Sequence, residues 1–421
     1  MRILHTADWH LGKMLEGRDR QAEQEQFIDE ICMIAVDERA DIVLIAGDVF
    51  QTANPSAAAE DLFFDAINRL ADHGRRGVVV LAGNHDNAER LMAPTPLAER
   101  LGITLVGLPA SVLSVSSPGR EGVRRVAAGP SWLELAVPDT DHSAVIVALP
   151  YPSEGRLKKM LAASLDEQEG RVGYNEYLTE VLGSLKQNFR PDTVNILASH
   201  IYVNGAKGTA PEMDAPVQMG GAYSVAPSTL DIGAQYVALG HLHRPQEVRG
   251  CGAPAYYAGS PLSYSFAESG QVKSVVVAEI LPGKAAEIRR LPLSASRPLV
   301  CWQARGGLPE VHRWIEEGLD ASAWIDLEIH ASQLLPAREI QVLRELRPDI
   351  VGIRIINQAQ GGADTASQSI RGLSAEEMFR RFFAARTNGL QPDEAMVNLF
   401  LALTQEMETE REAMSDETSQ S

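Results

Sequence analysis

The feature that most constrains the fold is an alternation of short apolar runs with longer stretches of helical periodicity. At the start of the chain the order is strand, helix, strand, helix, strand, over residues 2–8, 20–40, 41–48, 56–74 and 77–86. The short runs are apolar on both faces, as strands buried between two layers are, and the longer stretches are amphipathic. Further apolar runs occupy residues 142–150, 193–200, 235–243 and 274–280. The pattern predicts an α/β fold of layered sheets flanked by helices.

The chain divides into several predicted domains. Pro282 and Gly283 follow the last long run, so we place the first domain at 1–283. Residues 284–358 repeat a smaller alternation that predicts a compact βαβαβ domain. Residues 359–371 are rich in Gly, Ser, Ala and Gln, which is typical of a flexible linker. We expect a helical hairpin at 372–412 and a disordered tail at 413–421.

The predicted hairpin is apolar on one side of each helix. Ser374 and Glu377 form a capping-box pattern at its start. The apolar positions recur at helical spacing and are Met378, Phe379, Phe382 and Phe383 in the first helix and Met396, Leu399, Phe400 and Leu403 in the second. A hairpin this small cannot bury both apolar faces by itself.

Composition limits the cellular setting. Of 421 residues, 45% are hydrophobic and 22% charged, which is ordinary for a globular protein. Three distant cysteines, with no Cys-x-x-Cys pair, support neither a disulfide framework nor a thiolate zinc site and suit a reducing compartment. Without a signal-like segment or a long apolar run, we expect a cytoplasmic protein. The net charge of −18 argues against a general DNA-coating protein but not against a DNA enzyme, because metal ions can invert a local acidic field.

Polar side chains that can bind metal follow five of the apolar runs. They are Asp8 and His10, Asp48, Asn84 and His85, His200, and His241 and His243. In layered α/β folds ligands bind beyond the carboxyl ends of the strands, so several strands can deliver these side chains to one crevice.

The donors, apart from His85, are two Asp, one Asn and four His, with no sulfur. Such a set suits Mn, Fe or Zn and is too rich in imidazole for a dedicated Mg or Ca site. It is also too large for one ion. If one carboxylate bridges, the set fills two adjacent sites and leaves positions open for water and substrate, as two-metal phosphoester hydrolysis requires.

Each fragment alone has an ordinary structural explanation. Asp-x-His after a strand is more often a loop hydrogen-bonding pair, Gly-Asp is a common turn, and a lone His200 is more often a satisfied core histidine. Gly-His-Leu-His alone could be a surface turn. The Asn84-His85-Asp86 sequence is harder to explain structurally. The five fragments together, all at the ends of apolar runs, favour a metal centre over these separate explanations.

These motifs, in this order, resemble the calcineurin-like metallophosphoesterase superfamily. The longer stretches "RILHTADWHLGK", "IAGDVFQTANPS", "LAGNHDN", "YVALGHLHRPQ" and "YYAGSPLSYSF" resemble its SbcD family of double-strand-break repair nucleases. The resemblance implies a metallophosphoesterase β-sandwich flanked by helices, a small capping domain, and a C-terminal helical segment that docks on an SbcC-type ATPase. It also implies pairing of two copies through the nuclease domain and association with the nucleoid.

The resemblance also implies roles for individual residues. Asp8, His10, Asp48 and His243 would hold one ion, and Asp48 as the bridge, Asn84, His200 and His241 the other, with manganese the usual metal. His85 would act on the scissile phosphate or protonate the leaving oxygen. Unlike the protein phosphatases of this superfamily, "GDVFQTANPS" has no Arg and no second acid, so what orients His85 stays open, with the adjacent Asp86 one possibility.

The resemblance implies an ATP-dependent 3′→5′ double-strand exonuclease and single-strand or hairpin endonuclease, acting in repair and recombination. The sequence has no Gly-x-x-x-x-Gly-Lys-Ser/Thr loop, so ATP would be handled by another chain. Two alternatives are a small-substrate phosphodiesterase or phosphatase of the same superfamily and an interaction subunit with a vestigial metal site.

Cations near the motifs are candidates for DNA phosphate contact: Lys13, Arg18, Arg20, Arg90 and Arg244.

Overall fold

The computed structural model describes residues 1–109, 111–116, 122–153, 174–208, 224–331, 335–357 and 375–386, and beyond these only 392, 396, 397 and 400. The chain forms two compact units, Met1–Ile356 and Asn357–Ser421, which are described separately. The predicted linker at 359–371 and the predicted tail at 413–421 lie outside the described residues.

The first sheet has six strands in the order β15-β14-β1-β2-β3-β4. Four neighbouring strands are parallel: β1 (Arg2–Thr6), β2 (Ile42–Ala46), β3 (Gly77–Leu81) and β4 (Ile103–Val106). The antiparallel strands β14 (Ser274–Glu279) and β15 (Glu287–Pro292) extend the sheet beyond β1. The first sheet therefore runs to Pro292, past the boundary that we expected at residue 283, because β15 pairs with β14.

The second sheet has seven strands in the order β12-β13-β11-β8-β7-β6-β5. Its parallel centre consists of β7 (Ala144–Leu149), β8 (Val194–His200), β11 (Tyr236–Gly240) and β13 (Ala255–Tyr257). The antiparallel strands are β5 (Arg124–Gly129), β6 (Trp132–Ala136) and β12 (Gln246–Val248). A separate pair is formed by β9 (Tyr202–Val203) and β10 (Ser224–Val225).

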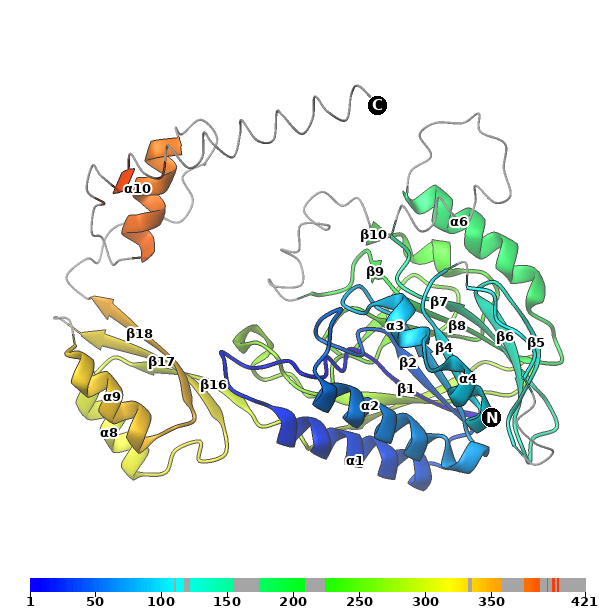
Figure 1. Cartoon of the computed structure of the whole chain (residues 1–421), viewed down its shortest axis with the longest axis horizontal. Coiled ribbons are helices and arrows are strands. Elements are labelled where there is room, and N and C mark those ends of the chain that lie inside the picture. The colour runs from blue at the N-terminus through cyan, green and yellow to red at the C-terminus, as the bar shows by residue number, and fades with distance from the viewer. Residues whose placement is uncertain are drawn as a thin grey trace. The chain divides into compact units, whose positions relative to one another are not determined.

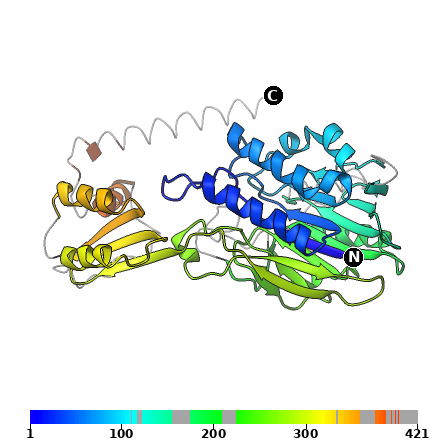
Figure 2. The same ribbon diagram turned by 90° about the horizontal axis from the view of Figure 1, so that it is seen from below.

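The two sheets pack face to face through a shared apolar core. Ile42 and Val79 of the first sheet lie in one cluster with Leu135 and Ile196 of the second. The opposite faces of both sheets are also buried, one under α1 (Gln21–Asp37) and α2 (Ala57–Leu70) and the other under α6 (Tyr174–Leu185). Burial on both faces explains why these strands read as continuous apolar runs. Figures 1 and 2 show the resulting layers of helix, sheet, sheet and helix, which confirm the predicted fold class.

Short helices complete this part of the chain. They are α3 (Ala88–Met92) and α4 (Thr95–Ala98) and the 3-10 helices η1 (Asp72–Gly74), η2 (Glu99–Leu101), η3 (Lys186–Asn188), η4 (Pro227–Leu230) and η5 (Phe266–Glu268). Helix α2 begins at a serine cap, where the Ser56 hydroxyl accepts a hydrogen bond from the backbone N–H of Ala59.

Residues after β15 form a three-stranded sheet in the order β16-β17-β18. Along the chain the elements are β16 (Leu299–Ala304), α8 (Leu308–Glu316), β17 (Trp324–Ala331), α9 (Ala337–Leu346) and β18 (Ile350–Asn357). The two helices cover one face of the sheet (Figure 1), where Val311 and Leu343 pack against Ile325 and Leu327. This is the βαβαβ order that the sequence predicts.

A buried polar cluster joins this small domain to the first one. The carboxylate of Glu23 in α1 accepts hydrogen bonds from Trp324 Nε1 at 2.9 Å and from the backbone N–H of Arg297 at 3.1 Å. One turn before it, Arg20 forms a two-point ion pair with the same carboxylate, at 2.5 and 2.7 Å. Helix α1 thus holds the connection between the two domains.

Candidate metal centre

The metal-binding side chains that the sequence predicts meet at one edge of the sandwich. Asp8, His10, Asp48, Asn84 and His85 follow β1, β2 and β3 of the first sheet, whereas His200, His241 and His243 end or follow β8 and β11 of the second. Contacts join the two sheets: His10 Nε2 lies 3.0 Å from His243 Nε2, and His200 Nε2 lies 3.0 Å from Asn84 Oδ1. The carboxyl ends of parallel strands meet here, as expected for a ligand site in a layered α/β fold.

The backbone at this edge adopts conformations that L-residues rarely take. The φ angles of Asp8, His10 and Asp48 are 54°, 45° and 49°, and that of His241 is 110°. Left-handed conformations at residues other than glycine are unfavourable and persist only where the surroundings enforce them. Here the backbone N–H groups of Asp8 and His10 donate to the carbonyl oxygens of Gly47 and Asp48, at 3.0 and 2.9 Å. Backbone hydrogen bonds between the two loops therefore help to hold these conformations.

Two of the motif glycines are needed for close approach. A Cβ atom at Gly83 would lie 2.1 Å from Asp48 Oδ1, and one at Gly240 would lie 1.8 Å from the carbonyl oxygen of Ala46. Both distances are far inside van der Waals contact. The glycines before Asn84 and His241 thus allow the loops of the two sheets to converge on Asp48 and Ala46.

Lone pairs converge on the space between these side chains. His200 Nδ1 donates to the carbonyl oxygen of Ala46 at 2.8 Å, so in the neutral ring Nε2 carries the lone pair. This Nε2 faces Asn84 Oδ1 at 3.0 Å and Asp48 Oδ2 at 3.4 Å, and both of these atoms are acceptors. His241 Nδ1 faces the same Asn84 oxygen at 3.1 Å. Acceptors this close to one another require a cation or a proton between them.

The electrostatics of the two buried aspartates agree with that requirement. Burial raises the pKa of Asp8 to about 7. Burial also acts to raise the pKa of Asp48, but the neighbouring His200 and His10 hold it well below its usual value. For His200, burial lowers the pKa, yet Asp48 and Asp8 outweigh it and raise the pKa to about 9. Without a metal, a proton on His200 offsets the carboxylate charge, and a metal cation would displace that proton.

The described residues supply two groups of ligand atoms that could each hold an ion. One is His10, Asp48 and His85, and the other is Asp8, Asp48 and His200, with the ligand atoms of each group within 4.8 Å of one another. Asp48 belongs to both, which is the placement that a bridging carboxylate requires. The oxygen and nitrogen donors fit divalent first-row metal ions.

Comparison with known proteins decides the family. Residues 1–245 match the family model of calcineurin-like phosphoesterases, and residues 295–387 match that of the Type 5 capsule protein repressor C-terminal domain. The chain is 43% identical over 410 residues to the SbcD subunit of the nuclease SbcCD from Bacillus subtilis, and the alignment covers 97% of this chain and 99% of that protein. The chain belongs to the SbcD family of calcineurin-like phosphoesterases.

More distant relatives carry the same name. The SbcD protein of Rhodobacter capsulatus is 30% identical over 320 residues, covering 73% of each chain. That of Escherichia coli K12 is 27% identical over 422 residues, covering 98% of this chain and 100% of that protein. Calcineurin-like phosphoesterases bind divalent metal ions, and the converging donors at the sandwich edge are this SbcD chain's candidates for that role.

His85, the predicted acid, is oriented by the backbone. Its Nδ1 donates to the carbonyl oxygen of Gln51 at 2.9 Å, and its backbone N–H donates to Asp48 Oδ1 at 2.9 Å. Asp86 does not orient the ring. Its carboxylate instead accepts backbone hydrogen bonds from Val49, Phe50 and Gly83, at 3.1, 2.9 and 2.8 Å, and so ties the loop after β3 to the loop after β2.

Sequence reasoning missed a buried carboxylate behind His243. Glu268 Oε1 lies 3.1 Å from His243 Nδ1, and Glu268 Oε2 lies 2.5 Å from Lys273 Nζ. Burial would raise the pKa of Glu268, but His243 and Lys273 hold it at about 2. No motif marks Glu268, because a glutamate in a serine-rich turn reads as an ordinary solvated residue. Only the fold brings it to the centre.

The predicted DNA contacts of this SbcD chain differ in availability. Arg18 and Arg244 are exposed, and Lys13 is half-buried with its Nζ 5.1 Å from the centre of the Tyr264 ring. Arg90 is exposed but pairs with Glu60 at 2.8 Å. Arg20 corrects our expectation: it is 1% exposed and paired with Glu23, so its guanidinium cannot reach a phosphate.

The predicted partner-binding helix is present in part. Helix α10 spans Ala375–Arg386, and its Phe379 ring stacks on Phe400 at 4.3 Å between centroids and contacts Phe383. Met378 and Met396 are exposed. The predicted positions Leu399 and Leu403, and the side chain of Phe382, lie outside the described residues.

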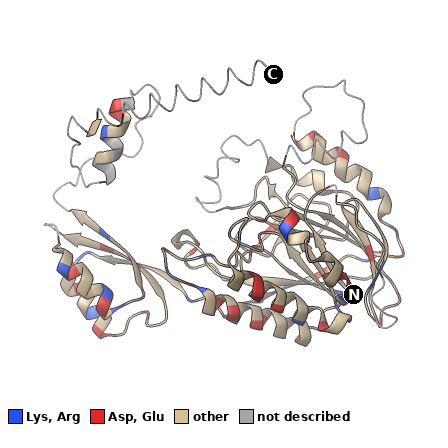
Figure 3. Ribbon diagram, in the orientation of Figure 1, with Lys and Arg blue, Asp and Glu red and all other residues tan. Residues whose placement is uncertain are grey.

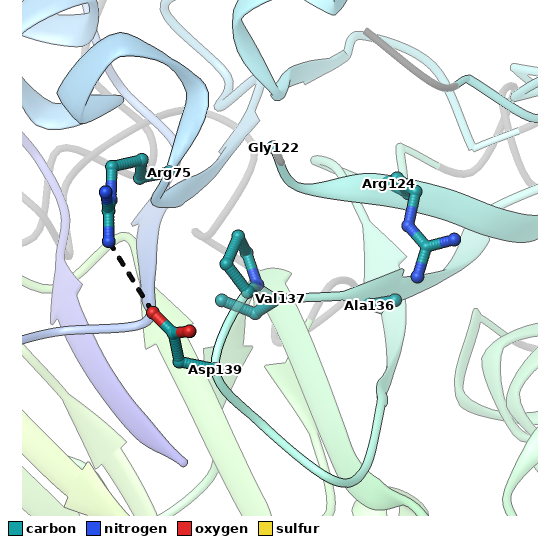
Figure 4. Close-up of a pocket in the computed structure, with 7 residues that line it drawn as sticks. Arg75, Gly122, Arg124, Ala136, Val137 and Asp139 are labelled. Carbon is teal, nitrogen blue, oxygen red and sulfur yellow. Dashed lines mark ion pairs between the residues drawn. The ribbon is translucent and has the colours of Figure 1, made fainter. Parts of the chain in front are cut away.

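A cavity away from the centre contains none of the predicted residues. It has a volume of about 350 Å³ and is lined by residues that include Arg75, Arg124 and Asp139, near the end of β6 (Figure 4). Arg75 pairs with Asp139 at 3.5 Å (Figure 4), and both side chains are exposed. Among the helices that the structure describes, none has the length and apolar character needed to span a membrane.

Proposed function

We propose that this chain is the nuclease subunit of a complex with an SbcC-type ATPase and that it hydrolyses DNA phosphodiester bonds with two divalent cations. Mn²⁺ is the cation that we propose for both positions. The observation that carries the proposal is the convergence of seven oxygen and nitrogen donors from two sheets on one edge, with Asp48 facing both groups. The names of the curated relatives support the nuclease activity and the complex.

In this proposal Asp8, His10, Asp48 and His243 would hold one ion, and Asp48, Asn84, His200 and His241 would hold the other. The two close groups of ligand atoms divide the residues differently, since they place Asp8 with His200 and His85 with His10; the shared position of Asp48 is common to both divisions. Two such cations would lower the pKa of a bound water and stabilise negative charge on the attacked phosphate. His85 supplies the proton. Because Nδ1–H donates to the Gln51 carbonyl, His85 would meet the departing 3′-oxygen through Nε2, and it can give a proton there only as the imidazolium, in which both ring nitrogens are protonated.

DNA would reach the centre along the loops after β1 and β11, where Lys13, Arg18 and Arg244 lie. The outer surface of α1 is unsuitable, because this helix has no basic residue and four of its acidic residues, Glu25, Asp29, Glu30 and Asp37, are exposed or half-buried (Figure 3). Phosphate contacts position DNA without reading its sequence. The arrangement therefore favours a nuclease that recognises DNA ends or hairpins by shape.

The proposal is tested by the reactions of His85→Gln. With Mn²⁺, the SbcC-type subunit and ATP, we expect the parent chain to cut duplex ends and the variant to lose at least about 10²-fold in rate, the usual range for a general acid. Metal content should not change. The matched control is His312→Gln in α8, which should cut at the parent rate.

The alternatives give different results. A parent chain that hydrolyses bis(p-nitrophenyl) phosphate but leaves duplex ends intact, even with the ATPase subunit, would indicate a small-substrate phosphodiesterase. A parent chain that binds no metal and cuts neither substrate would indicate an interaction subunit. An undiminished rate for His85→Gln would contradict the role of this histidine.

We propose that the hairpin at 372–412, beyond the capping domain at 284–358, binds the ATPase subunit. The exposed Met378 supports this, since a large apolar side chain on the surface suits a contact with a partner. Deletion of 372–412 should leave a folded nuclease domain that no longer copurifies with the ATPase. Retained copurification would contradict the proposal.

We propose that two copies pair through the nuclease domain. An apolar groove of about 300 Å³ lies between α2 and α4, and two large exposed side chains line it, Phe64 at 41% and Leu97 at 67% exposure. A second copy of the chain could bury both. Leu97→Glu should convert a dimer to a monomer in light scattering, whereas Leu281→Glu, at a position 54% exposed outside the groove, should not.

A further inference from the structure

Glu268 lies behind a predicted metal ligand and is almost completely buried. It is 1% exposed and ends the 3-10 helix η5. Its Oε1 atom lies 3.1 Å from His243 Nδ1 and accepts the backbone N–H of Tyr264 at 3.2 Å. A carboxylate placed this deeply needs both a positive charge and donors nearby.

Lys273 supplies the charge and ties the carboxylate to the loop of His243. The lysine is 2% exposed, and its Nζ donates to Glu268 Oε2 at 2.5 Å. The same Nζ donates to the carbonyl oxygen of His243 at 2.9 Å and to Ser260 Oγ at 3.0 Å. One ammonium group therefore holds both the carboxylate and the backbone of the histidine that the carboxylate contacts.

The contact determines which ring nitrogen of His243 carries the proton. A carboxylate can only accept, so Nδ1 must be the N–H group, and in the neutral ring Nε2 then carries the lone pair. That Nε2 lies 3.0 Å from His10 Nε2, on the side of the proposed ions. Two other histidines of the centre, His85 and His200, use backbone carbonyls for the same purpose.

We propose that Glu268, held by Lys273, is the positioning residue of His243: it keeps Nδ1 protonated and the Nε2 lone pair directed at the ion that His243 binds. This inference rests on the proposed two-ion function. A carboxylate behind a histidine ligand also makes the imidazole more basic, and loss of such a partner typically weakens metal binding 10–100-fold. The effect should fall on one ion, because the hydrogen bonds described for Glu268 include His243 and none of the other ion's proposed ligands.

Glu268→Gln keeps the size and shape of the side chain but changes which of its atoms can accept a hydrogen bond. Glutamine has one acceptor oxygen, and the charged Lys273 Nζ attracts it more strongly than the neutral backbone N–H of Tyr264, so that oxygen turns to Lys273 and the amide N–H₂ faces His243 Nδ1. The histidine then accepts on Nδ1 and carries its proton on Nε2, where metal must bind. In the double variant Glu268→Gln/Lys273→Met the glutamine oxygen is free to face His243 again. The double variant also lacks the buried ammonium group of Lys273, which has no counter-charge in the single variant. Its removal therefore favours folding.

The test measures Mn²⁺ affinity by calorimetry and the His243 tautomer in long-range ¹H–¹⁵N spectra of the metal-free full chain labelled with ¹⁵N-histidine. In Glu268→Gln we expect one of two Mn²⁺ sites to weaken about 10–100-fold and the proton to move to Nε2. The double variant should recover most of both. The control Glu134→Gln, which removes a carboxylate paired with Arg190 in the second sheet, should leave both sites unchanged.

The outcomes distinguish this inference from the function on which it rests. A parent chain that binds fewer than two Mn²⁺ ions would overturn the proposed two-ion function itself. If the parent binds two and Glu268→Gln binds both equally tightly, or keeps the proton on Nδ1, the positioning role is wrong and the function stands. A double variant that binds metal more weakly than the single one would show that the cluster only supports the fold, which also overturns the inference.

Discussion

Buried carboxylates at two places in the molecule are compensated in different ways. At the junction of the two domains, Glu23 receives two hydrogen bonds from the guanidinium of Arg20 and further ones from Trp324 and Arg297. At the metal centre, the described ion-pair partners of Asp8 and Asp48 are histidines, at 3.4 to 3.9 Å. All of these carboxylates are buried. The junction thus contains a permanent cation paired with its carboxylate, whereas no lysine or arginine among the described residues forms an ion pair with Asp8 or Asp48.

This difference separates a structural cluster from a binding site. The charge of a buried carboxylate with a fixed arginine partner is compensated in the folded protein whether or not a ligand is bound. Such a pair can therefore support the fold without any ligand. Carboxylates whose described ion-pair partners are imidazoles depend on protons or on a metal ion to compensate their charge. The substitutions below change the charges that compensate the carboxylates at each place. The experiments then measure the change in metal affinity and in the free energy of unfolding.

The largest effect is expected from Asp48→Asn, because Asp48 belongs to both groups of potential ligands. The substitution removes the negative charge that two cations would share and leaves a similar shape. We expect the variant to bind neither Mn²⁺ ion at concentrations that saturate the parent and to show no measurable cleavage. Calorimetry and a duplex-end assay measure the two losses. One fully retained Mn²⁺ site would show that Asp48 is not the bridge.

Arg20→Met should destabilise the fold without affecting metal binding. Removing one partner of a buried ion pair typically lowers the free energy of unfolding by about 3–5 kcal/mol, because the other charge stays buried without compensation. Urea unfolding of the metal-free chain measures this loss. The double variant Arg20→Met/Glu23→Gln should recover part of it. Mn²⁺ affinity within about threefold of the parent is expected, and a large loss would mean that the junction also shapes the centre.

Removal of metal should lower the stability of every variant whose metal centre is intact, and a change at the junction should not alter this effect. A ligand that binds only the folded state, at 100 times its dissociation constant, raises the free energy of unfolding by about 2.7 kcal/mol. We therefore expect a higher Tm in Mn²⁺ than in chelator, both for the parent and for Arg20→Met, and no difference for Asp48→Asn. Calorimetric scans in the two buffers check this. Equal Tm values for the parent in both would contradict a metal site in the folded chain.

Sequence and structure agree most where local pattern determines the outcome. The strand and helix order, the fold class and the placement of Asp8, Asp48 and His243 at strand ends follow from apolar periodicity and from the rule that parallel strands present ligands at their carboxyl ends. Arg20 shows the limit: a charged residue beside a motif looks like a DNA contact, and only tertiary packing shows that it is buried against Glu23. Glu268 and Lys273 show the same limit in reverse, since burial turns two ordinary surface residue types into partners of His243.

The smallest effect is expected at Glu134, a carboxylate whose arginine partner is partly exposed to solvent. Glu134 accepts two hydrogen bonds from the Arg190 guanidinium, at 2.7 and 2.9 Å, and the Arg190 side chain is 43% exposed. We expect Glu134→Gln to lower the free energy of unfolding by only about 1 kcal/mol at pH 7, as hydrogen bonds and partly exposed ion pairs typically contribute. Mn²⁺ affinity should not change.

The pH dependence of that loss gives its sign. The hydrogen bonds from Arg190 hold the pKa of Glu134 below its usual value. A carboxyl group with a lowered pKa in the folded state stabilises the protein above its unfolded pKa, about 4.3, and this contribution disappears as the pH falls through the folded-state value. The difference between the parent and Glu134→Gln should therefore be constant from pH 7 to about pH 5 and shrink below it, in urea unfolding with chelator present. A difference that persists unchanged at low pH would mean that the glutamine disturbs packing, and that the charge on Glu134 contributes nothing to the stability of the second sheet.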